Sequence, residues 1–127
     1  MWRIDRATYE ATRVGQFPGL DSVAVAFGSL WLTSRSQSHL WKLDPADGTV
    51  LGQLDLPEPS GVVPVDDALW ITTYDGGLVQ LDPATLSIRS ERKLQYAALG
   101  PPIYAFGSLW VSALENDAVL RISLDQG

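Results

Sequence analysis

The residue types that most often carry chemistry are sparse in this chain of 127 residues. Its single histidine, His39, stands between Ser38 and Leu40, and the sequence contains no cysteine. A general base or a metal centre needs a further ligand or a group that orients the imidazole. The sequence places neither beside His39, so we predict no catalytic residue, no metal site and no cofactor.

Aspartates recur at a regular spacing, at Asp5, Asp44 and Asp82. Repeated carboxylates suggest repeated cation sites, but a calcium loop brings several oxygen ligands close together, and the repeated string offers one. An Asp ahead of a tight turn commonly accepts a hydrogen bond from the backbone two residues on. We therefore interpret the three aspartates as turn residues.

Three tryptophans, Trp31, Trp70 and Trp110, share the setting Leu-Trp-aliphatic-Ser/Thr. They could form an aromatic wall for a sugar or another flat ligand. Alternatively they pack between adjacent repeats, because an aromatic side chain at a fixed strand position buries a large apolar area. We expect all three to be interior and equivalent. We expect the same of Trp2 and Trp41, which share a position in a second repeated string.

Two strings return along the chain with a period of about 40 residues. The first reads AFGSLWLT at 26–33, VDDALWIT at 65–72 and AFGSLWVS at 105–112. The second reads WRIDRAT from residue 2, WKLDPAD from 41, VQLDPAT from 79 and LRISLDQ from 120. A repeat of this length that carries alternating strand patterns is typical of a propeller blade.

The repeat predicts an all-β fold of about three four-stranded antiparallel blades in a single, partial β-propeller domain. The expected units are 1–19 (the C-terminal half of a blade), 20–57, 58–97 and 98–127 (an incomplete blade). Because the chain opens and closes in mid-blade, we expect its termini to share a blade and the chain to supply half of a six-bladed ring. The pattern contains one strand more than three complete blades require.

Composition and charge argue against several classes of protein. The formal net charge is -6 and the nine Lys and Arg residues are scattered, so binding to nucleic acid, which depends on clustered basic residues, is not expected. No apolar run approaches the length of a membrane span. The first residues are polar and strand-like, so no signal peptide is expected in this chain, and its compartment stays open.

With the repeat laid out, the chain resembles the bacterial YVTN-type and virginiamycin-B-lyase-like β-propellers. The strings that carry the resemblance are GSLWLTS from Gly28, KLDPADGTV from Lys42, QLDPATLSI from Gln80 and GSLWVSA from Gly107. The resemblance covers essentially the whole chain. It implies the blade rather than an activity, because families that share the motif include both lyases and binding domains. The lyase-like members hold a metal-dependent His/Glu constellation near the central axis, whereas this chain has one histidine.

The connections differ between repeats while the strands hardly change, as in a scaffold that presents a binding surface. The loops that should gather at one end of the central channel supply eight candidate ligand-binding residues. These are Arg35, Gln37, Tyr74, Asp75, Tyr96, Glu115, Asn116 and Asp117.

We therefore favour a non-enzymatic binding or interaction module that takes a small molecule or a protein at the mouth of the channel. Its ring would be completed by a homodimer or by further blades of a longer chain. The alternatives are a propeller enzyme of the streptogramin-lyase or lactonase type and a purely structural propeller fragment.

Overall fold

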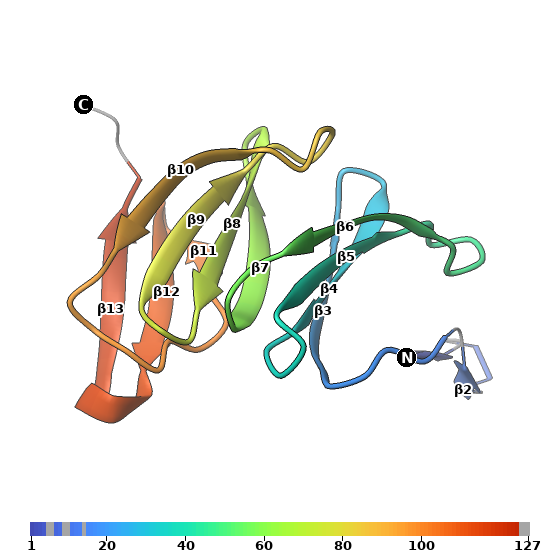
Figure 1. Ribbon diagram of the computed structural model, residues 1–127, viewed down its shortest axis with the longest axis horizontal. Helices are drawn as coiled ribbons and strands as arrows, with labels where there is room; N and C mark the ends of the chain where they lie inside the picture. Colours follow the sequence, from blue (N-terminus) through green and yellow to red (C-terminus); the bar gives the residue numbers. More distant parts are fainter. Residues whose placement is uncertain (5–6, 9–10, 14, 125–127) are drawn as a thin grey trace.

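The computed structural model describes residues 1–4, 7–8, 11–13 and 15–124. Within these ranges the chain is all-β, with thirteen strands and one 3-10 turn. The strands form antiparallel sheets that follow one another as propeller blades (Figure 1). The predicted fold class is confirmed.

Two sheets have four strands each in sequence order. Blade 1 comprises β3 (Leu20–Ala26), β4 (Ser29–Ser34), β5 (His39–Leu43) and β6 (Val50–Asp55). Blade 2 comprises β7 (Pro59–Val65), β8 (Ala68–Thr73), β9 (Gly77–Leu81) and β10 (Ile88–Lys93). The first strands of successive blades, β3 and β7, lie in contact.

Blade 3 has three strands in the described part of the chain: β11 (Ile103–Ala105), β12 (Ser108–Ala113) and β13 (Ala118–Ser123). The 3-10 turn η1 (Leu114–Asn116) joins the last two. The strands β1 (Trp2–Ile4) and β2 (Ala11–Arg13) form a separate hairpin at the opposite end of the molecule from β13 (Figure 1). Residues 5–6, 9–10 and 14 of the half-blade expected over 1–19 lie outside the described residues.

The repeated aspartates are turn residues where they are described. Asp44 accepts a hydrogen bond from the backbone N of Ala46 (2.8 Å), and Asp82 accepts one from that of Ala84 (2.8 Å). The Arg89 guanidinium, 2.9 Å from the Asp82 carboxylate, together with the backbone N–H groups of Thr85 and Ala84, lowers the pKa of Asp82 to about 2. Asp5 lies outside the described residues.

The core lies between the blades. We call the sheet face that carries Trp31, Trp70 and Trp110 the front face and the opposite one the back face. Trp31 on the front of blade 1 is fully buried in a cluster with Leu69 and Ile71, which lie on the back of blade 2. Its indole N donates a hydrogen bond to the Ala26 carbonyl (2.9 Å). The front of blade 1 is therefore covered by the back of blade 2.

The same contact recurs once more along the chain. Trp70 on the front of blade 2 is buried with Leu109 from the back of blade 3. Trp110 keeps the local geometry, since its indole N donates to the Ala105 carbonyl at 2.8 Å, but it is only half-buried. The expectation of three equivalent tryptophans is wrong for Trp110, because no described blade follows blade 3.

The two tryptophans that share the third-strand position, Trp41 and Trp2, also differ in burial. Trp41 on the back of blade 1 is buried, as expected, and its ring lies 5.3 Å from that of Phe17. Trp2, at the matched position in β1, is 62% exposed. The expectation of an interior Trp2 is wrong, because no described blade lies against the hairpin to cover it.

Truncation of the matched tryptophans should separate the two environments. Trp70→Ala should lower the free energy of unfolding by about 3–5 kcal/mol, as expected when a buried aromatic leaves a cavity. Trp110→Ala should cost less than about 2 kcal/mol, because less apolar area is removed from contact. Urea denaturation of the two variants measures both values. Equal losses would contradict front-to-back packing as the source of Trp70 burial.

The hairpin turn of blade 3 offers a stabilising change. Phe106 and Gly107 both have positive φ (53° and 76°), as in a type I′ turn, and Phe106 is 96% exposed. Phe106→Asn should raise the free energy of unfolding by about 1 kcal/mol, because asparagine tolerates the left-handed region better. The matched control is Phe27→Asn, in the same turn of blade 1, where the side chain is less exposed. Thermal unfolding that shows a loss at Phe106 would contradict the turn argument.

Candidate functional site

The loops that sequence analysis singled out lie at one end of the blades, which we call the loop end. It comprises the loops 35–38, 74–76 and 114–117 and the connections 56–58 and 94–102. Backbone hydrogen bonds join these segments across the blades. They run from Leu56 N to Ser38 O (3.0 Å), Tyr74 N to Glu58 O (2.8 Å), Ala98 N to Tyr74 O (2.7 Å) and Leu114 N to Ala98 O (3.1 Å). The loop end is thus held as a continuous surface.

Two of the candidate ligand-binding residues contact each other across the first blade boundary. The guanidinium carbon of Arg35 lies 4.3 Å from the centre of the Tyr74 ring, a cation-π arrangement. The backbone N of Gln37 donates to the Ser34 hydroxyl (3.2 Å), which fixes the turn of its loop.

The candidates of blade 3 lie in or beside the 3-10 turn. Glu115 and Asn116 belong to η1, and Asp117 follows it with a left-handed φ of 50°. All three are exposed. The structure does not bring them together with the candidates of the other loops in one cavity.

A groove of about 330 Å³ opens at the loop end between blades 1 and 2. It contains one of the candidates, Asp75, together with residues of the β6–β7 connection and of strands β8, β9 and β10. Its apolar lining comes from Leu56, Pro57, Leu78 and Val79, and its polar lining includes Thr73, Asp75, Glu91 and Lys93. The groove therefore combines an apolar floor with charged groups at its rim.

The charged rim is partly neutralised internally. Lys93 lies 3.3 Å from a carboxylate oxygen of Asp75, and the Thr73 hydroxyl donates to the other oxygen of the same group. The Thr73 hydroxyl, and secondarily Lys93, hold the pKa of Asp75 below its usual value near 3.8. The same hydroxyl accepts a hydrogen bond from the backbone N of Gly77 (2.8 Å). Thr73 therefore holds the 74–76 loop in place and favours the ionised form of Asp75.

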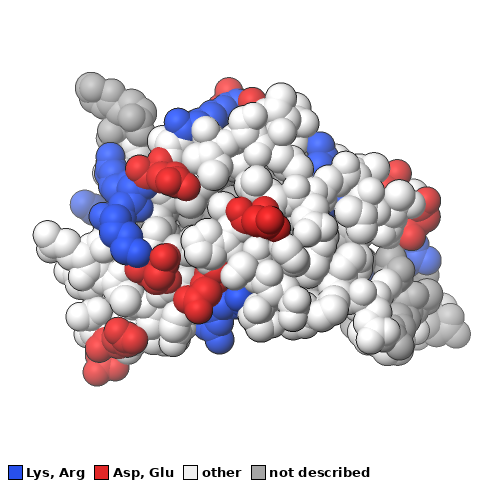
Figure 2. Space-filling view, in the orientation of Figure 1, with Lys and Arg blue, Asp and Glu red and all other residues white. Residues whose placement is uncertain are grey.

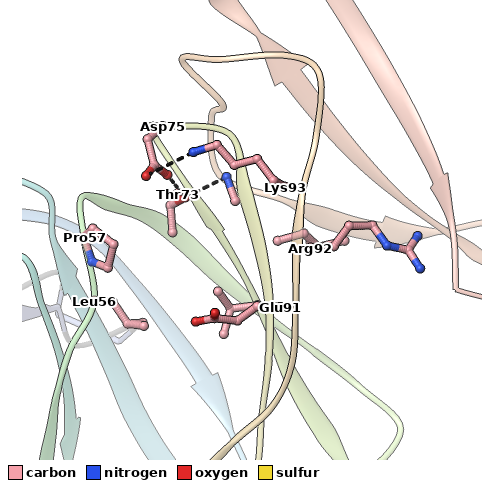
Figure 3. A pocket seen from close by; sticks show the side chains of 10 residues that line it. Leu56, Pro57, Thr73, Asp75, Glu91, Arg92 and Lys93 are labelled. Atoms are coloured by element: carbon pink, nitrogen blue, oxygen red, sulfur yellow. Dashed lines mark hydrogen bonds and ion pairs between the residues drawn. The ribbon is translucent and has the colours of Figure 1, made fainter.

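Glu91 is the acid of the groove that no described residue neutralises. Its carboxylate makes no hydrogen bond or ion pair to the part of the chain that the structure describes. Figure 3 shows Glu91 directed across the groove toward Leu56, while Arg92 points away from it. The groove thus presents an apolar surface beside a free carboxylate.

A second groove, of about 400 Å³, lies one blade further along the chain. It is formed by residues 94–96 of the β10–β11 connection, including the candidate Tyr96, and by residues 119–122 of β13. It has the same place beside blade 3 as the first groove has beside blade 2. In the first groove the fourth strand, β10, forms the outer wall, whereas no described strand lies outside β13 to form such a wall in the second. Basic residues gather near this side of the molecule, over the ends of β10 and β13, next to acidic ones (Figure 2).

His39 lies outside both grooves. Its Nδ1 is 2.8 Å from a carboxylate oxygen of Asp55, and the Gln53 amide lies 3.3 Å from the same nitrogen. Its ring also lies 5.5 Å from that of Trp41. The contacts with Asp55 and Gln53 connect β5 to β6, so His39 has a structural role in holding these two strands of blade 1 together.

Among the described residues, no three His, Asp or Glu side chains lie close enough together to form a metal site. None of the described segments forms a helix with the length and hydropathy that a membrane crossing requires.

Sequence reasoning found Asp75 but missed Glu91, Thr73 and Lys93. Thr73 and Lys93 stand at the ends of β8 and β10 and Glu91 lies within β10, and none of the three belongs to a sequence motif. The signal that could have found Glu91 and Lys93 is their place in a strongly charged fourth strand, RSERK at 89–93. The strand borders the loop end only once the blade is formed.

Comparison with solved structures supports the β-propeller fold. No protein-family model matches the sequence, and no curated protein is significantly similar to it. Streptogramin B lyase superposes with a TM-score of 0.77 at 18% identity, over 97% of this chain and 44% of the lyase chain. BamB from Moraxella catarrhalis gives 0.76 at 15% identity, over 94% of this chain and 36% of its own.

Glutaminyl cyclase from Myxococcus xanthus is a further match, with a TM-score of 0.67 at 12% identity over 82% of this chain and 47% of its own. All three are β-propeller proteins. The chain is a β-propeller segment, and it spans less than half the length of each of these structures. At such identities the likeness concerns the fold alone and does not select an activity or the YVTN-type repeat.

The role of Thr73 can be tested by titration. Thr73→Val should raise the pKa of Asp75, because the hydroxyl is the largest influence that lowers it. The stability that this depressed pKa contributes is present above the unfolded value and is lost as the pH falls through the folded one. The variant should also lose about 1–3 kcal/mol of stability at neutral pH, since the Gly77 N–H loses its acceptor. Carboxyl NMR of Asp75 and urea denaturation measure the two effects, and an unchanged pKa would contradict the assignment.

Proposed function

We propose that this chain is a non-enzymatic binding module whose site is the groove between blades 1 and 2. The observation that carries the proposal is the free carboxylate of Glu91 beside an apolar floor that includes Leu56 and Leu78. Binding sites of this kind pair a predominantly apolar lining with a few polar groups that fix orientation. The groove faces the loop end, where repeat proteins leave their connections free to vary.

The chemistry of the groove favours a ligand with an apolar body and one positive charge. Asp75 already has Lys93 as a partner, so Glu91 is the acceptor that stays available. The formal net charge of -6 adds a field that attracts cations and repels anions. A peptide in which a Lys or Arg is flanked by aliphatic residues has this chemistry, and so does a small amphipathic amine.

The test uses a blocked Leu-Lys-Leu tripeptide as the probe and amide NMR shifts as the readout. The expected shifts are confined to the segments 56–57, 73–79 and 91–93. Glu91→Gln should weaken binding roughly threefold, about 0.7 kcal/mol, as expected when an ion pair at an exposed site is lost. The matched control is Glu115→Gln, which removes the same charge outside the groove and should leave binding unchanged.

Two results would refute the proposal. One is equal binding of Leu-Lys-Leu and Leu-Glu-Leu to the wild-type protein. The other is a set of shifts that lies on the 114–117 loop rather than in the groove. Retention of affinity in Glu91→Gln would exclude its carboxylate as the recognition group.

A further inference from the structure

Blade 3 leaves its front face open. Ile103 is 60% exposed and Val119 is 74% exposed, and Trp110 lies half-buried between them. In blades 1 and 2 the tryptophan of this face is buried beneath the back face of the following blade. Blade 3 therefore presents one half of an interface that the chain forms twice internally.

Blade 1 leaves part of its back face open. Val23 and Val25 of β3 are 55% and 73% exposed, although Leu32 and Trp41 on the same face are buried beneath Met1 and Phe17. The exposed positions belong to the innermost strand, and the covered ones to later strands. Beside blade 1, the described part of the chain thus supplies the outer strands of a preceding blade but not its inner ones.

The β1–β2 hairpin corresponds to the outer part of a blade. Its pairing Trp2↔Arg13 and Arg3↔Thr12 matches Trp41↔Gln53 and Lys42↔Gly52 in blade 1. The strand β1 (WRI) therefore has the same place in a blade as β13, in which residues 120–122 read LRI. In the described part of the chain, blade 3 thus has its three inner strands without a fourth strand, and the β1–β2 hairpin at the opposite end has the two outer strands without inner ones.

From this complementarity we propose that two copies of the chain associate head to tail into a closed ring. Blade 3 of one copy packs its front face on the open back face of blade 1 in the second copy. Strand β2 of the second copy adds as a fourth strand beside β13, along the edge that no described strand of the same copy covers. A two-fold rotation repeats the junction on the other side, which leaves no open blade face.

The junction cannot hold both β13 and β1, because they occupy the same place. Ile122 of β13 already packs with Trp70 and Leu109 in the core between blades 2 and 3. In β1, by contrast, Trp2 and Ile4 are both exposed, and the strand pairs with β2 alone among the described strands. Strand β1 is therefore the one that is displaced, and Thr12 comes to lie opposite Arg121.

The added strand would also complete the second groove. In the first groove β10 forms the outer wall, and β2 of the second copy takes that place beside β13. The second groove is then a site to which both copies contribute. This inference rests on the blade faces and the strand register. It is independent of the ligand proposed for the first groove.

The test is a cysteine cross-link, which the absence of native cysteine makes specific. The double variant Thr12→Cys, Arg121→Cys should form a covalent dimer under mild oxidation, because directly opposed strand residues have Cα atoms about 4.5–5.5 Å apart, within the range of a disulfide. Within one copy the two strands lie at opposite ends of the molecule (Figure 1). The control double variant Thr12→Cys, Asp47→Cys, with the second cysteine in an exposed turn, should stay uncoupled.

Light scattering of the wild-type chain provides the second readout, with an expected mass of twice 13.8 kDa at micromolar concentration. Val119→Asp should shift it to the monomer without loss of folding, since the side chain is exposed in the single chain. Ile88→Asp, which places the same charge on the outer strand of blade 2, should leave the dimer intact. A wild-type monomer would overturn the proposal and favour further blades of a longer chain as the occupant. A dimer without the specific cross-link would overturn the assignment of β2 to β13.

Discussion

The packing of one blade's front face on the next blade's back face is the interaction on which the rest of the structure depends. It buries Trp31 against Leu69 and Ile71, and Trp70 against Leu109. Within a blade, backbone hydrogen bonds hold the strands together, but a single sheet cannot bury its apolar side chains without a second layer packed on it. Stability in such an array comes from terms within each repeat and between neighbours. The blades are therefore equivalent in sequence and unequal in environment.

This constraint decides which features could be predicted from the sequence. Strand positions, the aspartate turns and the burial of Trp31 and Trp70 follow from the repeat. Trp110 and Trp2 do not, because the exposure of a blade face is set by the neighbour and not by the residues on it. The local hydrogen bond of Trp110 to Ala105 forms without that neighbour. Local geometry and burial are thus separable in this fold.

The groove illustrates a different limit. Asp75 could be proposed because it stands in a variable loop, whereas Glu91 stands in a strand whose register places it beside Val79. The cavity joins Leu56 to Glu91, from different blades, and no local motif encodes that meeting. The sequence also does not show which acid Lys93 pairs with. In the folded blade Lys93 forms an ion pair with Asp75, and the Glu91 carboxylate has no partner among the described residues. The charge distribution of the groove is therefore set by strand register.

The two ends of the array share one physical problem. Unpaired strand edges and uncovered apolar faces promote association, and proteins usually protect them. In this chain the front of blade 3 and the back of blade 1 are the two halves of a single repeated contact, so covering one with the other solves both problems at once. A contact of that kind is heterologous, and it gives a finite particle only when its rotation closes. If copies associate through these two faces, the angle between successive blades, which the internal packing of Trp31 and Trp70 already fixes, decides between a closed ring and an open chain of copies.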